Sequence, residues 1–372
     1  MPFPGSQIHD TIGLAYFLHC YINLFRIAGL ALIAMPVYHY WKHGKLRQKI
    51  VPAFFILFYA LIFYFFNFIA QADKMFVQPS NKIFSSASVN KVSEKNLVIG
   101  VAIKGESKAF PIQFIGYHHQ VMDTIGGTRV IVTYCTVCRS GRVFSPLING
   151  RPEKFRLVGM DHFNAMFEDA GTGSWWRQEN GEAIAGPLKG KLLDEIPSQQ
   201  MTLKEWIAEH PETKILQPDS LFENDYEMLK GYDYGFTKNP LEYTDPESWQ
   251  MKSWVVGVVA GDHEKAYDWN EIERVRMIND TIGFIPVLVL LEKDSFSFHT
   301  FGRIIDNQEL FFQWNGSLQS ITDSETSSVW NSRGECIEGS LKGKVLTPLP
   351  CYLEYWHSWK QFHPNTTTYQ MN

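Results

Sequence analysis

The sequence lacks features that several classes of protein require. It has 34 Lys plus Arg residues against 39 Asp plus Glu, a formal net charge of −5. No basic excess is therefore present to neutralise a phosphate backbone, and nucleic acid is not an expected partner. Five cysteines in 372 residues are too few for a disulfide-built scaffold. Apolar residues make up 45% and charged residues 20%, which excludes a disordered or collagen-like chain.

Charge is nearly absent from two long stretches near the N-terminus. Residues 50–70 contain no charged side chain, and residues 11–35 contain only Arg26, which either faces the other stretch or reaches the headgroups. An apolar run of about 20 residues is long enough to cross a bilayer as a helix. We therefore predict a transmembrane helical hairpin over residues 1–75, with spans at about 11–35 and 50–70 and a lipid bilayer as its partner.

The connection between the two predicted spans is basic. It contains Lys42, Lys45, Arg47 and Lys49. Short positively charged loops stay on the cytoplasmic side of a membrane. We expect a two-pass protein of the cell (inner) membrane, with the rest of the chain on the extracytoplasmic, periplasmic side. That compartment is oxidising, so the cysteines must be interpreted accordingly.

An internal repeat organises the remainder of the chain. Residues 98–110 match residues 255–267 at an offset of 157, and residues 181–197 match residues 334–350 with 10 of 17 positions identical. Such collinear matches indicate a duplicated unit. The predicted domains are a first module at 76–216, a linker or ordered loop at 217–253, and a second, degenerate module at 254–372.

Within each module the local pattern is mostly that of strands. Short runs rich in β-branched residues, such as 98–103 and 130–134, are bounded by Gly turns, and residues 123–127 (DTIGG) predict a hairpin turn. Residues 202–210 predict a short helix with Thr202 as its N-cap. The predicted fold class is α+β and β-rich, with two transmembrane helices followed by a soluble domain of two similar modules.

A C-x-x-C pair, Cys135 and Cys138, occurs in the first module only. At the 157-residue offset the second module has Glu292 and Ser295. This spacing brings two sulfurs within reach of one disulfide or one metal ion, and Arg139 next to them would favour a thiolate. The surrounding pattern predicts strand, tight turn and strand. It does not predict a helix N-terminus, so a thioredoxin-like site is not indicated.

Several hypotheses for this pair stay open. In a thiol–disulfide oxidoreductase-like protein, Cys135 or Cys138 would attack a disulfide, peroxide or similar electrophile, and the other would resolve the intermediate. His118 would exchange protons, the partner would be a small-molecule or protein thiol, and no cofactor is needed. In a metal- or cofactor-binding module, Cys135, Cys138, His118 and His162 would bind a soft metal ion such as copper or zinc. A structural disulfide or buried thiol pair, and an interaction scaffold that binds through the linker, are the remaining alternatives.

The other cysteines suggest structural roles. Cys336 and Cys351 lie where the first module has Ala183 and Ser198. We expect either a structural disulfide between them or two unpaired thiols. Cys20 lies in the first predicted span, and we interpret it as an apolar filler.

The order of the motifs resembles that of the DUF3179 family of exported or membrane-tethered prokaryotic proteins. The resemblance rests on YHHQVMDTIGG (117–127), VTYCTVCRSGRVF (132–144) and TGSWWRQ (172–178), and it is strong over about residues 90–216. It implies a site in the first module but no substrate, since the family has no settled activity. Family motif positions are matched by His118, Cys135 and Cys138, and by three candidates for cofactor binding, Asn164, Trp176 and Gln178. Departures from the motifs occur at Tyr117, His119, Met122 and Thr136.

Overall fold

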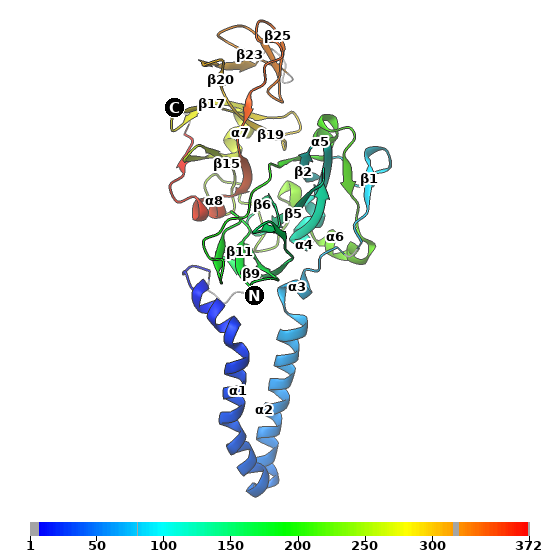
Figure 1. The fold of residues 1–372 in the computed structure, drawn as a ribbon, viewed down its shortest axis with the longest axis vertical. Coiled ribbons are helices and arrows are strands. Elements are labelled where there is room, and N and C mark those ends of the chain that lie inside the picture. Colours follow the sequence, from blue (N-terminus) through cyan, green and yellow to red (C-terminus); the bar gives the residue numbers. More distant parts are fainter. Residues whose placement is uncertain (1–6, 80, 315–319, 371–372) are drawn as a thin grey trace.

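The computed structural model describes residues 7–79, 81–314 and 320–370. Two long helices form an N-terminal hairpin, and the rest of the chain folds into many small sheets at one end of it (Figure 1). Helix α1 spans Ile12–His43, and α2 spans Leu46–Tyr64 and continues as the π-helical turn η1, Phe65–Ile69. Both helices are long and apolar enough to cross a membrane. The β-rich α+β fold class with two N-terminal apolar helices is confirmed.

Polar contacts link the hairpin helices to each other and to the soluble part. Arg26 of α1 donates a hydrogen bond of 2.8 Å to Asn67 of η1, so its charge faces the other helix rather than lipid. Near the start of α1, the Tyr16 hydroxyl donates to the Gly173 carbonyl at 3.1 Å. The N-terminal end of the hairpin is thereby fixed against the first half of the soluble part.

The first half contains three sheets that succeed one another along the chain. Their strand orders are β1-β14-β3-β2-β13, β4-β5-β6 and β12-β11-β10-β9, and β7 and β8 form a separate pair. The elements that follow the hairpin are α3 Ala72–Met75, β1 Phe84–Ser86, η2 Ala87–Val89, β2 Leu97–Ile103, β3 Glu106–Pro111, α4 Ile112–His118, β4 Gln120–Ile125, β5 Thr128–Cys135, β6 Ser140–Phe144, β7 Leu147–Ile148, β8 Arg151–Pro152, β9 Phe155–Asp161, β10 Asn164–Asp169, β11 Trp175–Arg177, β12 Ala183–Ala185, β13 Gln199–Thr202, α5 Leu203–Glu209 and β14 Lys214–Leu216.

The second half follows the same order of elements. Its sheets are β27-β15-β16-β28, β17-β18-β19-β26 and β22-β23-β24-β25, with β20 and β21 as a separate pair. Its elements are β15 Trp254–Ala260, β16 His263–Asp268, α7 Trp269–Val275, β17 Met277–Ile282, β18 Ile285–Leu291, β19 Phe298–Gly302, β20 Ile304–Ile305, β21 Gln308–Glu309, β22 Phe312–Trp314, β23 Ser320–Asp323, β24 Val329–Asn331, β25 Cys336–Glu338, β26 Thr347–Pro348, β27 Cys351–Tyr355, α8 Trp356–Phe362 and β28 Thr367–Thr368.

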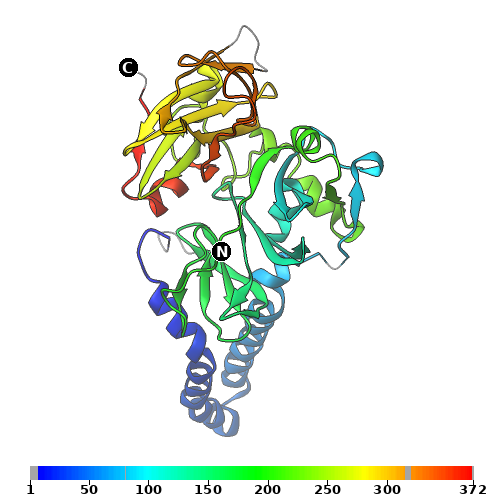
Figure 2. The ribbon, with the colours of Figure 1, turned by 45° about the horizontal axis from the view of Figure 1, so that its top comes forward.

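One packing detail recurs in both halves. A Cβ atom added to Gly100 would lie 2.3 Å from the Trp206 ring, and one added to Gly257 would lie 2.2 Å from the Trp359 ring. Each Trp belongs to the helix that covers its sheet, α5 or α8, and only glycine leaves room for the ring. Figure 2 shows the second half, in yellow to red, stacked on the first half, in cyan to green. A common origin of the halves by duplication stays a prediction.

The segment between the halves is ordered. It forms η3 Ser220–Phe222, α6 Glu223–Met228 and η4 Tyr232–Tyr234. Tyr226 and Tyr232 are buried in the hydrophobic cores of the first half. The start of the predicted linker therefore packs as part of the first half.

The predicted helix cap is confirmed, and the predicted disulfide is not formed. Thr202 caps α5 by accepting a hydrogen bond from the Glu205 amide, as predicted. All five cysteines are free. Cys336 and Cys351 are consequently unpaired, because β25 and β27 belong to different sheets; the disulfide alternative is wrong.

Candidate functional site: the thiol pair between the two halves

The C-x-x-C pair lies on a tight turn between two strands. Strand β5 ends at Cys135, which pairs with Ser140 at the start of β6, as the sequence predicted. Both cysteines are buried, at 1% and 0% exposure. Their sulfurs lie 3.5 and 3.4 Å from one acceptor, the Phe163 carbonyl oxygen at the tip of the β9–β10 hairpin. The two thiols are therefore neighbours in a dry environment.

The second half of the chain closes over this turn. The Tyr355 amide donates to the Cys138 carbonyl at 2.9 Å, and His357 Nε2 lies 3.1 Å from the Val137 carbonyl. The buried Ser358 side chain lies beside the Cys138 thiol. These residues come from the end of β27 and from α8, so the thiol site forms only where the two halves meet.

The contact between the halves is reciprocal. At the end of β13, Thr202 donates its amide proton to the Ser297 hydroxyl at 3.0 Å and its hydroxyl proton to Asp294 at 2.8 Å. The first half thus covers the β18–β19 turn of the second half, as the second half covers the thiol turn. In each half, the junction between a strand and the helix that follows it covers the turn of the other half. These junctions are β13–α5 in the first half and β27–α8 in the second.

Lys252 supplies a positive charge beside the thiols. Its side chain is 6% exposed, and its ammonium group donates to the Val137 carbonyl at 2.5 Å and the Leu241 carbonyl at 2.6 Å. Burial lowers the pKa of Lys252, and the attraction of the two thiol groups offsets part of this change. This lysine comes from the segment between the halves, and no sequence motif marked it.

The surroundings of the two thiols shift their pKa values in opposite directions. Burial alone would raise the pKa of the Cys135 thiol, but hydrogen bonds from Cys138 and from the Ala165 amide, with the Lys252 charge, lower this pKa below its usual value. For Cys138, burial and the neighbouring Cys135 raise the pKa well above its usual value, although the Ser358 hydroxyl opposes the change. Of the two thiols, Cys135 therefore loses its proton more readily than Cys138.

Arg139 is placed away from the thiols. Its guanidinium group donates to the carbonyls of Tyr232 and Asp233, at 3.1 and 2.8 Å, and stacks 3.6 Å from the Trp254 ring centroid. Its φ of 58° turns the chain so that the side chain leaves the sulfurs. The charge beside the thiols belongs to Lys252 instead of Arg139, as a correction to the sequence interpretation.

The histidines do not join the thiols either. His118 Nδ1 contacts the Val77 carbonyl, and its Nε2 lies 2.7 Å from the Tyr226 hydroxyl, so both ring nitrogens are engaged elsewhere. His162 pairs with Asp161 at 2.7 Å. Within the residues that the structure describes, no group of three or more His, Cys, Asp or Glu side chains is placed to bind a metal ion. The set of Cys135, Cys138, His118 and His162 is not brought together as metal ligands, and His118 is not placed as an acid–base group for the thiols.

The three residues matched to family motifs have structural partners. Asn164 donates to the Gln178 side chain at 2.8 Å and accepts from the Glu179 amide at 2.9 Å. Gln178 in turn accepts from the Ser140 hydroxyl at 2.8 Å. The Trp176 indole donates to Asp169 at 2.9 Å, deep in the core. These residues fix β6 and the chain around Glu179.

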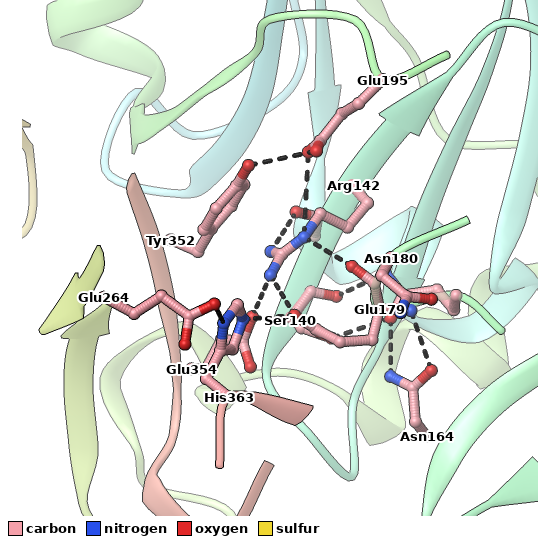
Figure 3. Close-up of polar contacts among 12 residues, drawn as sticks. Ser140, Arg142, Asn164, Glu179, Asn180, Glu195, Glu264, Tyr352, Glu354 and His363 are labelled. Carbon is pink, nitrogen blue, oxygen red and sulfur yellow. Dashed lines mark hydrogen bonds and ion pairs between the residues drawn. The ribbon is translucent and has the colours of Figure 1, made fainter. Parts of the chain in front are cut away.

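A buried ion-pair network next to the thiols joins the halves (Figure 3). Arg142 of β6 donates hydrogen bonds to Glu179 of the first half and to Glu354 of β27 in the second half. Its guanidinium group lies 3.4 Å from the Tyr352 ring centroid. All three charged side chains are at most 2% exposed. Because one cation faces two carboxyl groups, the network favours a single negative charge and a single proton on the pair.

The pKa values of the two carboxyl groups are shifted in opposite directions. Burial and the nearby Glu179 carboxylate raise the pKa of Glu354 to about 8. Burial opposes ionisation of Glu179 too, but Arg142 and His363 lower its pKa overall. His363 lies 3.6 Å from Glu179 and 2.9 Å from the partly exposed Glu264, so this network extends from the thiol site toward solvent (Figure 3).

Sequence reasoning missed Lys252, Glu354, His357 and Ser358. All four lie outside the module that contains the thiols, and comparison of the two copies directed attention to residues unique to the first copy.

Comparison with known proteins gives one match. A family model described as "Protein of unknown function (DUF3179)" matches residues 79–366. No curated protein and no solved structure matches the chain.

Proposed function

The chain belongs to the DUF3179 family, whose description assigns no activity, and we propose that Cys135 and Cys138 form a redox-active dithiol. The observation that supports this is the unequal environment of two adjacent free thiols, with the pKa lowered at Cys135 and raised at Cys138. Thiol–disulfide exchange needs one nucleophilic thiolate and a second thiol that stays protonated until it resolves the mixed disulfide. Lys252 supplies the positive charge that favours the Cys135 thiolate.

The proposed reaction partner is a disulfide. The Cys135 thiolate attacks one sulfur of the partner disulfide, forms a mixed disulfide and releases the first partner thiolate. Cys138 then loses its proton and attacks the Cys135 sulfur, which releases the second partner thiolate; the proton ends on one of the two. The protein dithiol is oxidised to a disulfide, and the partner disulfide is reduced to two thiols. The Ser358 hydroxyl is buried beside Cys138 and has no hydrogen-bond partner among the described residues, so it is placed to pass the proton.

Access requires movement of the β9–β10 tip, because both sulfurs are buried. The two tip residues, His162 and Phe163, have φ values of 49° and 67°, a left-handed conformation that is costly for residues other than glycine. The Phe163 amide donates to the Gln7 side chain at 2.9 Å, so the segment that precedes α1 holds this tip. We take the tip as the movable cover of the thiols.

The test is a redox titration of the full chain in detergent micelles. Replacing Cys20, Cys336 and Cys351 removes the other thiols. At varied ratios of oxidised to reduced dithiothreitol, this background variant is expected to gain and lose two thiol equivalents reversibly. Adding Cys135→Ser abolishes reaction with a small disulfide, whereas Cys138→Ser leaves one reactive thiol that accumulates as a mixed disulfide. A thiol count that does not change across the titration contradicts the proposal.

We also propose that the hairpin spans the inner membrane and that the soluble part is extracytoplasmic. The basic connection between α1 and α2 lies at the end of the hairpin remote from the soluble part (Figure 1). Short basic loops stay cytoplasmic, which places the thiols on the other side. Alkaline phosphatase, which is active only outside the cytoplasm, is expected to be active when fused to the C-terminus and inactive when fused after Lys45. The reverse pattern contradicts this orientation.

A further inference from the structure

A cavity of about 320 Å³ lies beside α7, outside the thiol site. Its walls include Trp254 and Trp269, each 7% exposed, and the rings of Tyr234 and Phe296. The two Trp rings lie 5.7 Å apart at 67°, and Tyr234 and Phe296 lie 5.0 Å apart at 84°. An aromatic ring has an electron-rich face, so a wall built of four such rings can offer a surface to a cation.

The charged residues of this cavity are all acidic among the residues that the structure describes. Asp245, Asp268 and Glu273 line it, and no Lys, Arg or His lines it in the part of the chain that the structure describes. Arg139 stacks on Trp254, but its guanidinium group is buried, is bonded to backbone carbonyls and does not line the cavity. Asp245 accepts from the Lys252 amide, which leaves Asp268 and Glu273 as the carboxylates available to a ligand. A cavity with aromatic walls and carboxylates favours a cation.

One carboxylate oxygen lacks a partner. Asp268 caps α7, and its Oδ2 atom accepts from the Ser248 hydroxyl at 2.7 Å and from the Glu271 amide at 3.2 Å. Its Oδ1 atom has no hydrogen-bond partner among the described residues, although the side chain is only 5% exposed. A buried, unpaired carboxylate oxygen is costly, and a bound cation would remove that cost. Burial raises the pKa of this carboxyl, which agrees with a missing counter-charge.

We propose that this cavity binds a small organic ammonium ion, with Asp268 as its counter-charge and the Trp269 ring as its cation–π surface. A bare metal ion is disfavoured, because most of the wall is aromatic and the described residues hold no three-ligand cluster. The volume suits a ligand of few heavy atoms. The first half lacks this site, since Pro111 and Ile112 stand at the positions of Asp268 and Trp269.

The ligand is a free solute rather than a lipid headgroup. Figure 1 shows α7 in the second half, with the first half between it and the helical hairpin. A headgroup of the bilayer that the hairpin crosses would not reach the cavity. A soluble amine or quaternary ammonium compound is the class of ligand that fits.

Calorimetric titration of the full chain in maltoside micelles tests the proposal with choline and its neutral isostere, 3,3-dimethylbutan-1-ol. Choline is expected to bind saturably, and the alcohol at least tenfold more weakly, because the shapes agree and only the charge differs. Asp268→Asn is the matched variant: asparagine still caps α7, so the fold is kept, and choline affinity is expected to fall at least tenfold.

Trp269→Leu is expected to abolish the tryptophan fluorescence change on choline addition. Phosphatidylcholine vesicles are expected not to compete with free choline. Absence of saturable choline binding, equal affinity for the alcohol, or unchanged affinity in Asp268→Asn would overturn the proposal, and competition by the vesicles would overturn its assignment to a free solute. None of these results depends on the thiols.

Discussion

Arg142 and Glu354 are hydrogen-bonded in the interior although 212 residues of chain separate them. Arg142 follows the thiol turn on β6, and Glu354 precedes the helix that covers that turn. Their pairing therefore sets the position of α8 over Cys138. Arg142 also forms a buried ion pair with the Glu179 carboxylate. Such a pair adds little net stability over an apolar pair, but loss of one partner is costly because the other charge stays buried.

Arg142→Met is expected to destabilise the protein by about 3–5 kcal/mol, because it leaves the Glu179 carboxylate buried without its cation. Urea unfolding in micelles, followed by tryptophan fluorescence, measures the change. The double variant Arg142→Met with Glu179→Gln is expected to recover part of the loss, since no uncompensated charge remains. Equal stability of Arg142→Met and the native protein would contradict the buried network.

Lys252→Met is expected to raise the pKa of the Cys135 thiol, because it removes the positive charge that favours the thiolate. The measurement is the pH dependence of Cys135 alkylation in the variant that lacks the three remote cysteines. Its midpoint should move to higher pH, and a midpoint higher by one pH unit means a thiolate fraction about tenfold lower at any pH well below it. Lys360→Met, at an exposed position on α8, is the control and should leave the midpoint in place. An identical midpoint in both variants would refute the role of Lys252.

The raised pKa of Glu354 predicts how the free energy of unfolding depends on pH. Its pKa is about 8 in the folded protein and near the ordinary value of 4.5 in the unfolded chain. Between these values the folded state binds a proton that the unfolded state releases, so the free energy of unfolding falls as pH rises, by at most about 1.4 kcal/mol per pH unit for this group. The contribution is fully present below pH 4.5 and is lost as pH rises through about 8. Glu354→Gln should flatten the slope of unfolding free energy between pH 5 and 8 in urea titrations, and an unchanged slope would argue against a protonated Glu354.

The two glycine–tryptophan contacts provide a matched pair of variants. Gly100→Ala and Gly257→Ala each place a methyl group within 2.3 Å of an indole ring, so each is expected to cost about 1–3 kcal/mol of stability. Only Gly257→Ala displaces α8, which covers the thiols. It should speed alkylation of Cys135 in the folded protein, whereas Gly100→Ala should not. Equal alkylation rates in the two variants would contradict the assignment of α8 as part of the thiol cover.

Local features could be predicted from the sequence because neighbouring residues determine them. The apolar runs predicted α1 and α2, the Thr202 cap predicted the start of α5, and the pattern around Cys135 predicted its strand–turn–strand setting. Arg139 shows the limit of such reasoning, since its left-handed φ directs the side chain away from the adjacent sulfur.

The sequence by itself determined that a two-helix apolar hairpin precedes a β-rich soluble part and that two cysteines share one turn. The tertiary structure is needed to show which groups surround those thiols. His357 and Ser358 reach them because the junction of β27 and α8 packs onto the β5–β6 turn, and Lys252 reaches them from the segment between the halves. No local pattern specifies that contact. It depends on burial of charge and apolar surface between halves that are distant along the chain.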